Sequence, residues 1–162
     1  MATDMYIKFD DIKGESSQSQ HEEWSEIFAW RHQVHQPTPP SRVNDGSTTE
    51  RAKHFPITIN KRWDMSTIDI LKYNWSGKQF EKVTIDCLKS AGDEPIVYLK
   101  IEMDDVIVCD YNVDASEGNV PIETIGLDYS KITYTYNPKN KDDAMAIGQM
   151  PVSADLKTNV IE

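Results

Sequence analysis

The stretch Trp63–Gly77, WDMSTIDILKYNWSG, decides the fold, because it carries the clearest helical signal of the chain. Ser66 is a suitable N-cap residue, and Asp69 three residues later can reach back to the backbone N–H of the cap. Gly77 closes the stretch with a residue that readily adopts the left-handed conformation at a helix end. The pattern therefore predicts one short helix, which needs a larger surface to cover.

The spacing of the large apolar residues predicts which side of this helix faces the core. Ile68, Leu71 and Trp75 recur at the three- and four-residue intervals of one helix face. A helix with a single apolar face is stable only when that face is covered. We expect these three side chains to pack against a sheet.

The remainder of the chain reads as strands separated by turn residues, with apolar and polar side chains alternating. The pair Asp104-Asp105 marks the best hairpin signal, between two β-rich runs. About eight strands are too many for an open sheet with two bare edges. We expect a mainly β fold, a small β-barrel of two packed sheets with one α-helix at its side. The expected strands are Met5–Ile12, Trp24–Val34, Phe55–Asn60, Phe80–Leu88, Ile96–Met103, Val106–Val113 and Ile122–Tyr136.

One domain, residues 1–140, accounts for all of these elements. Inside it, the segment Gln36–Lys53, QPTPPSRVNDGSTTERAK, is a long loop whose prolines and Asn-Asp-Gly deny it helix and strand alike. A loop of this length inside a compact domain is usually functional or disordered. Residues 141–162 show no sustained period, and we expect a weakly ordered tail or docking segment.

Composition narrows the class of partner. The 162 residues are 38% hydrophobic and carry a formal net charge of −10, which argues against nucleic acid as a partner. No apolar run is long enough to span a membrane. The first residues lack a basic segment followed by an apolar one, so we expect folding in the cytoplasm and no cleavable secretory signal.

Motifs that would indicate an active site are missing from the sequence. The chain has no nucleophile elbow, no P-loop and no dinucleotide fingerprint. His32 and His35 point to opposite faces of a regular strand, so we expect surface histidines rather than a metal site. Cys87 and Cys109 are expected to be buried free thiols, with a disulfide as the minority reading. We expect no catalytic, cofactor-binding or metal residues, and no cofactor.

Two alternatives stay open from the residues alone. Trp24 or Trp63 could be the stacking platform of a monomeric β-sandwich module that binds carbohydrate or another ligand. Glu102 and Asp110 could be the acidic pair of an enzyme, although Asp104-Asp105 between them reads as a turn. The balance of the residues favours a binding or assembly module.

Three stretches together resemble the Hcp family, the tube protein of type VI secretion. They are MATDMYIKFDDIKGES at 1–16, ITINKRWDMSTIDILKYNWSGKQFEKVTIDCLKS at 57–90 and PIETIGLDYSKITYTYNPKN at 121–140. The order of elements also fits: a first strand, a proline-rich loop, a strand leading into one helix, and an aromatic last strand. The similarity covers nearly all of residues 1–138. It departs in Gln36–Lys53 and after Asn140, where the family varies.

The resemblance implies a small barrel that forms homohexameric rings, which stack head to tail into a tube. It also implies a VgrG-type spike at the tip, a contractile sheath around the tube, export without a cleaved signal, and effector proteins carried in the ring. On this reading, Gln36–Lys53 and Met1–Tyr6 contribute to contacts between rings. The expected ring-stacking residues are Met1, Thr3, Tyr6, Pro39, Arg42 and Asp45.

Overall fold

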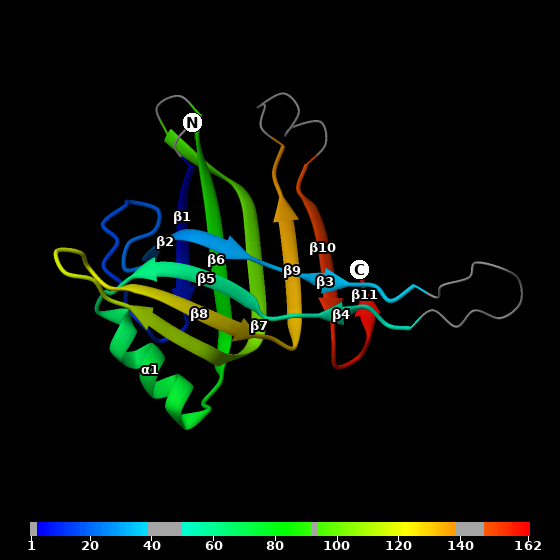
Figure 1. Ribbon diagram of the computed structural model, residues 1–162. Helices are drawn as coiled ribbons and strands as arrows, with labels where there is room; N and C mark the ends of the chain where they lie inside the picture. Colours follow the sequence, from blue (N-terminus) through cyan, green and yellow to red (C-terminus); the bar gives the residue numbers. More distant parts are fainter. Residues whose placement is uncertain (1–2, 39–49, 92–93, 139–147) are drawn as a thin grey trace, which may run out of the picture.

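The computed structural model describes residues 3–38, 50–91, 94–138 and 148–162, and within them eleven strands and one helix (Figure 1). The elements are β1 Thr3–Phe9, β2 Ser25–Arg31, β3 Val34–His35, β4 Lys53–His54, β5 Ile57–Arg62, α1 Ser66–Ser76, β6 Phe80–Ala91, β7 Glu94–Asp114, β8 Ile122–Asp128, β9 Lys131–Tyr136, β10 Met150–Asp155 and β11 Val160–Ile161.

Six of the strands close into a barrel. Their order is β7-β6-β1-β2-β5-β8, and β8 pairs again with β7, so the sheet returns on itself. The alternation expected in β6 is confirmed, because Val83, Ile85 and Cys87 all point into the core. The same register places Ile7 of β1 and Ile101 of β7 beside Ile85. The prediction of a mainly β fold, a small barrel with one helix at its side, is confirmed.

The expected hairpin at Asp104-Asp105 is wrong. Residues Glu94–Asp114 form one continuous strand, and Asp105 bends it by taking a positive φ of 51°. Aspartate tolerates this left-handed conformation better than most residues. The part of β7 before the bend pairs with β9 and the part after it pairs with β8. Ser130 secures the bend, because its backbone N–H and its hydroxyl both contact the Asp104 carbonyl oxygen.

Three strands extend the sheet beyond the barrel. We call β9, β10 and β11 the flap; β9 pairs with β7, β10 with β9, and β11 with β10. The expected single strand Ile122–Tyr136 is therefore two strands, of which β8 belongs to the barrel and β9 to the flap. Met150–Asp155 and Val160–Ile161 form strands, so this part of the expected weakly ordered tail or docking segment is ordered, whereas residues 141–147 lie outside the described residues.

The ends of α1 agree only in part with the sequence reading. Gly77 takes a φ of 68° and ends the helix as expected. At the other end, Met65 occupies the N-cap position without a side-chain hydrogen bond. Asp64, one residue earlier, accepts a hydrogen bond from the Ser66 backbone N–H at 2.9 Å, which makes it the side chain that satisfies the first turn.

The predicted core face of α1 is wrong. The helix buries Ser66, Thr67 and Ile70, whereas Ile68 is 51% exposed and Trp75 is 79% exposed. Leu71 is half-buried. The reason is that the first turn of the helix has to meet polar groups of the barrel rather than apolar ones. Small hydroxyl residues do so, and the larger apolar stripe is left facing outward.

Those polar groups form a buried ionic cluster under the helix. The Lys61 ammonium lies 2.6 Å from Glu123 and 2.8 Å from Asp64, and both Lys61 and Glu123 are fully buried. The Thr67 hydroxyl donates to Glu123 at 2.9 Å, and the Tyr111 hydroxyl donates to the other carboxylate oxygen at 2.6 Å. The cluster thus ties β5, β8 and β7 to the first turn of α1.

Candidate functional site

The candidate functional features of this chain are surfaces: a cleft beside β1 and β2, a two-stranded arm, the flap and the outward side of α1. Among the described residues, no group of three or more His, Cys, Asp or Glu side chains could hold a metal ion. Glu102 lies 3.5 Å from the Lys82 ammonium, while Asp110 lies beyond the bend of β7. These two carboxylates therefore do not form the acidic pair considered from the sequence. The described segments also contain no helix with the length and apolarity needed to cross a membrane.

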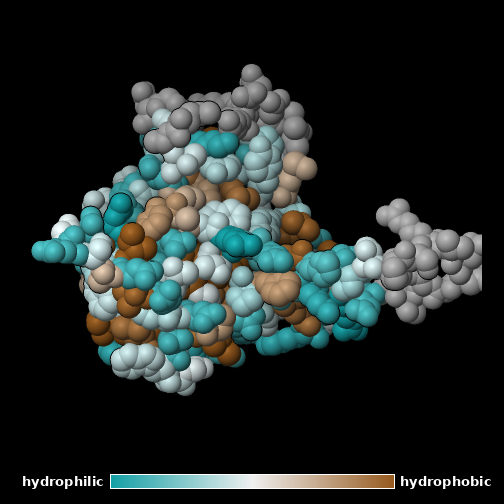
Figure 2. Space-filling view, viewed as in Figure 1, coloured by the Kyte–Doolittle hydropathy of each residue, from teal (hydrophilic) through white to brown (hydrophobic). Residues whose placement is uncertain are grey.

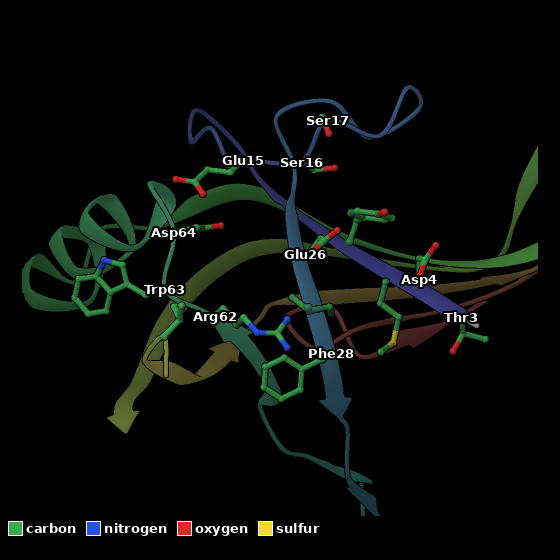
Figure 3. A pocket seen from close by; sticks show the side chains of 14 residues that line it. Thr3, Asp4, Glu15, Ser16, Ser17, Glu26, Phe28, Arg62, Trp63 and Asp64 are labelled. Atoms are coloured by element: carbon green, nitrogen blue, oxygen red, sulfur yellow. The ribbon is translucent and has the colours of Figure 1, made fainter. Parts of the chain in front are cut away.

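A cleft of about 590 Å³ opens beside β1 and β2 (Figure 3). We call it the acidic cleft, because four carboxylates and one guanidinium line it. Phe28 and Trp63 contribute aromatic rings to the same wall and are 44% and 38% exposed. The acidic cleft is lined by Thr3, Asp4, Met5, Tyr6, Glu15, Ser16, Ser17, Glu26, Ile27, Phe28, Arg62, Trp63, Asp64 and Val120.

Three of the charged groups in the acidic cleft are already engaged, and the first of them, Glu15, accepts a hydrogen bond from the Met65 backbone N–H at 3.1 Å. The Arg62 guanidinium lies 5.7 Å from the centre of the Phe28 ring, a cation–π arrangement. Burial raises the pKa of Asp64, but hydrogen bonds from Lys61 and Ser66 outweigh it and hold that pKa below its ordinary value. Asp4 and Glu26 are exposed on adjacent strands. The cleft is therefore suited to a partner segment that carries basic and apolar side chains.

A two-stranded arm projects from the barrel between β2 and β5 (Figure 1). We define the arm as β3, β4 and the described residues next to them, 36–38 and 50–52. The Gln36 side chain donates to the Glu50 carbonyl at 2.6 Å, which continues the contact between the two sides of the arm beyond the strands. Arg51 and Lys53 are exposed on it, as is Val34 at 46%. The described part of the arm thus carries more positive than negative side chains.

An imidazole–phenol cluster lies at the base of the arm. The two ring nitrogens of His32 lie 2.7 Å from the Tyr134 hydroxyl and 2.6 Å from the Tyr129 hydroxyl. His54 of β4 is the second imidazole, with ring centres of the two histidines 6.2 Å apart. Burial, and then the neighbouring His54, lowers the pKa of His32 below its ordinary value. Burial raises the pKa of Tyr134 to about 12.

The flap exposes an apolar face that continues the face lining the barrel. In β10 the side chains of Met150 and Val152 share this face with Tyr136 and Tyr134 of β9, their cross-strand partners. Met150 and Val152 are each 53% exposed, and Ile161 of β11 is 75% exposed. An apolar face that runs from the core into solvent is typical of an interaction surface.

The outward side of α1 is a second apolar surface. We call Ile68, Leu71 and Trp75 the helix stripe. Hydrophobic residues also reach the surface beside α1 in Figure 2, away from the flap. A tryptophan that is 79% exposed is unusual for a side chain of that size.

The expected ring-stacking residues divide into two groups. Met1, Pro39, Arg42 and Asp45 lie outside the described residues. Thr3 and Tyr6 both line the acidic cleft. Thr3 is exposed, but Tyr6 is only 5% exposed because its ring stacks on His21 at 5.0 Å. Tyr6 therefore offers little exposed surface, and its part in stacking stays a prediction.

The histidines and the cysteines depart from the sequence reading. His21 is buried, with its imidazole 2.8 Å from the Asp86 carboxylate, and His32 is half-buried in the cluster described above. The expectation of surface histidines is therefore wrong for His32, whereas His35 is exposed as expected. No spacing marked these partners, because they lie 65 and about 100 residues away along the chain. Both thiols are free as expected; Cys87 is buried, but Cys109 is exposed.

The tryptophans offered for carbohydrate stacking also differ in their surroundings. Trp24 meets the His21 ring edge-on, with ring centres 4.6 Å apart, and is half-buried. Trp63 stays open to solvent in the wall of the acidic cleft. Of the two tryptophans, Trp63 is the one that lines this cleft.

Comparison with known proteins places this architecture in one group. Residues 6–136 match a family described as "Type VI secretion system effector, Hcp". "Protein hcp1" of Pseudomonas aeruginosa is 26% identical over 161 residues, 99% of each chain. The crystal structure of Hcp1 from Salmonella typhimurium superimposes with a TM-score of 0.78 at 24% identity over the full length of both chains. A type VI secretion system effector from Yersinia pestis has a TM-score of 0.75 at 25% identity, covering 94% of this chain and 99% of its own.

Proposed function

The chain belongs to the Hcp family of type VI secretion system proteins, and from this membership we propose that it is a tube subunit whose copies close into six-membered rings that stack into a tube. The single observation that carries the proposal is the apolar face of the flap, which continues from the barrel core into solvent. In an isolated chain this apolar face would stay exposed to water, whereas contact with a neighbouring chain would bury it.

Within a ring, the flap of one copy packs on the next copy. Neighbours in a closed ring meet through two different surfaces of the same chain, since a head-to-tail contact generates a ring when its rotation closes. The flap and the helix stripe would supply such a pair, because α1, which carries the stripe, and the flap lie on different sides of the barrel (Figure 1). Trp75 is the largest exposed side chain of the stripe and would be the anchor of the contact.

Between rings, the arm of one copy enters the acidic cleft of a copy in the next ring. Arg51 and Lys53 of the arm complement Asp4 and Glu26 of the cleft. Val34 of the arm would pack against Phe28 and Trp63, the aromatic side chains of the cleft wall. Such a contact would explain how Gln36–Lys53 and Met1–Tyr6 take part in stacking.

The partners of the tube follow from the family as further proposals. The tube would carry a VgrG-type spike, would lie inside a contractile sheath, and would leave the cytoplasm as part of the machine. Effector proteins would travel in the central hole of the ring. A structural role of this kind requires no cofactor and no catalytic residue.

The mass of the purified protein in solution tests the proposal. Light scattering behind a sizing column should give a particle near six times the 18.5 kDa of one chain. A variant with Trp75→Ala and Val152→Asp should give single chains that keep the circular dichroism spectrum of the parent. A parent protein that stays monomeric at high concentration would overturn the ring.

A monomeric ligand-binding module is the second candidate, and the exposed ring of Trp63 in the acidic cleft favours it. It predicts a single chain in the same light-scattering experiment and a change in tryptophan fluorescence on adding glycans. Trp63→Phe should abolish that change. The alternative fails if the fluorescence of the parent is unaffected by the glycans tested.

A further inference from the structure

The cluster at the base of the arm has a defined pattern of hydrogen-bond donors. The Tyr129 hydroxyl lies 3.2 Å from the Phe55 carbonyl oxygen and 3.4 Å from His54 Nδ1; because the carbonyl can only accept, we assign the Tyr129 proton to it. Tyr129 then accepts from the His32 Nε2–H at 2.6 Å. The remaining nitrogen, His32 Nδ1, is left without a proton and accepts from the Tyr134 hydroxyl at 2.7 Å. This network uses the neutral imidazole of His32, with every donor matched.

A second proton on His32 breaks the pattern. Nδ1 would become a donor facing the hydroxyl hydrogen of Tyr134, which would have to turn away. Tyr134 would then lose the acceptor it has in the described structure, at a half-buried position where an unmatched donor is costly. Protonation therefore reverses the hydrogen bond between His32 and Tyr134 and leaves the Tyr134 hydroxyl hydrogen unmatched, which disfavours the charged imidazole while His32 stays in the cluster.

The surroundings oppose the charge as well. The titratable groups that act on the cluster are His54 on His32, Tyr134 and Asp128 on Tyr129, and Cys87 on Tyr134. The one carboxylate of this set, Asp128, acts on Tyr129 rather than on His32. The flanking side chains Arg31 and Lys53 are themselves cationic. A positive imidazole at His32 thus lacks a compensating carboxylate among the described groups that act on it.

The arm depends on this cluster for its attachment to the flap. Tyr129 follows β8, Tyr134 belongs to β9, and the two bind His32 just before β3 and the Phe55 carbonyl just after β4. The β3 side of the arm is therefore tied through both phenols, and the β4 side through Tyr129 alone. Because the cluster disfavours a charged His32, acid favours a state in which His32 has left it and the arm is loosened where it leaves the barrel.

We propose that His32 is a pH-sensitive latch that holds the arm against Tyr129 and Tyr134 while neutral and releases it when protonated. Under the proposed function, on which this consequence rests, mild acid would weaken contacts between rings while leaving each ring closed. The released state would appear as pH falls from the ordinary pKa of histidine towards the lowered one.

Hydrogen exchange at the Phe55 amide reads the latch directly, because this N–H donates to the Gln33 carbonyl at 3.0 Å across the base of the arm. Exchange is measured at about pH 7.5 and about pH 5.5, corrected for intrinsic rates, with amides of β6 as the internal reference. Protection at Phe55 relative to β6 should fall in acid, by up to about tenfold for each unit by which the pKa of His32 is lowered. Equal protection at both pH values would overturn the latch.

Two variants make the test specific. His32→Gln keeps one donor and one acceptor but cannot titrate, so its protection at Phe55 should not depend on pH. His35→Gln removes an exposed imidazole from the same arm and should behave as the parent. A pH-dependent loss in His32→Gln equal to that of the parent would contradict the proposal.

A direct titration covers the case in which His32→Gln fails to fold. The imidazole signals of the parent, followed by nuclear magnetic resonance, should give a pKa for His32 below 6.5, and a value at or above 6.5 would contradict the latch. These measurements report on the arm of a single chain. Their outcome therefore does not depend on whether the protein forms rings. Tubes that persist in acid despite a loosened arm would refute the stacking role of the arm and leave the latch in place.

Discussion

Lys61 and Glu123 form an ion pair with both side chains fully buried, and the ammonium nitrogen lies 2.6 Å from a carboxylate oxygen. Asp64 accepts from the same ammonium at 2.8 Å. The pair stands between strands β5 and β8 beneath the first turn of α1. Breaking such a pair by removing one partner leaves the other charge buried, which is more damaging than replacing both.

We therefore expect Lys61→Met to lower the free energy of unfolding by about 3–5 kcal/mol. The double variant Lys61→Met, Glu123→Leu should recover a large part of that loss, because no buried charge is left alone. Denaturant melts measure both. Lys13→Met, which removes the exposed pair with Glu23, serves as the control and should leave the melt nearly unchanged. A loss in Lys61→Met no larger than the control's would show that the pair is not buried in solution.

Substitutions on the buried side of α1 should change the stability of the fold, whereas substitutions on its exposed side should change assembly. Ile70→Ala should cost roughly 2–5 kcal/mol of unfolding free energy, because the side chain is fully buried. Trp75→Ala should leave the melt of the single chain almost unchanged and should reduce the fraction of rings in light scattering. The reverse result, a large loss of stability with Trp75→Ala, would restore the face predicted from the spacing of Ile68, Leu71 and Trp75.

Deleting Pro37–Thr49 should leave rings intact and reduce tube formation, as seen by electron microscopy of the purified protein. The deletion joins the two sides of the arm and leaves the flap and the helix stripe untouched. A deletion variant that forms tubes as readily as the parent would rule out the arm as a stacking element.

Charge reversal tests the acidic cleft as the receiving surface. Glu26→Lys and Lys53→Glu should each reduce stacking, since each places like charges together. The double variant should stack better than either single variant, because the attraction returns with the signs exchanged. Glu81→Lys, an exposed change outside the cleft, is the matched control. Independent losses that simply add in the double variant would mean that these two residues do not meet.

The pH dependence of folding should show a contribution from Asp64. The ion pair and hydrogen bonds hold the pKa of Asp64 below its ordinary value of 3.8 in the folded chain. A lowered carboxyl pKa stabilises the fold fully above the ordinary value, and this stability is lost as pH falls through the lowered one. Asp64→Asn should therefore flatten stability against pH below about pH 4, whereas Asp69→Asn, on the exposed side of the first turn, should not. Identical acid profiles for Asp64→Asn and the parent would contradict this assignment.

Much of the barrel could be predicted from alternation alone, because a residue such as Ile85 in β6 needs only its neighbours in sequence to show which side faces inward. The helix face could not. Ranking residues by apolarity favours Trp75 over Thr67, yet the buried position opposite Thr67 is occupied by Glu123, which requires a hydroxyl. Nothing local to the helix contains that information.

The bend of β7 could not be predicted from the sequence, for a related reason. Two adjacent aspartates are typical of a hairpin turn, but a single residue with a positive φ also bends a strand without reversing it. The outcome depends on Ser130, 25 residues further along, which contacts both Asp104 and Asp105. The imidazole–phenol cluster at the base of the arm was out of reach in the same way, because its members come from three separate parts of the chain.

The continuous strand β7 has a consequence for how this sequence can vary by insertion and deletion. Its buried side chains alternate on each side of the bend, with Ile101 and Met103 before it and Val106 and Val108 after it, and the strand is paired with β6, β8 and β9. One added or lost residue on either side of the bend would move a whole row of side chains to the opposite face of the sheet, in the barrel or next to the flap. Length changes between related chains should therefore accumulate between β3 and β4, where the strands on either side are only two residues long, and should be rare within residues 94–114.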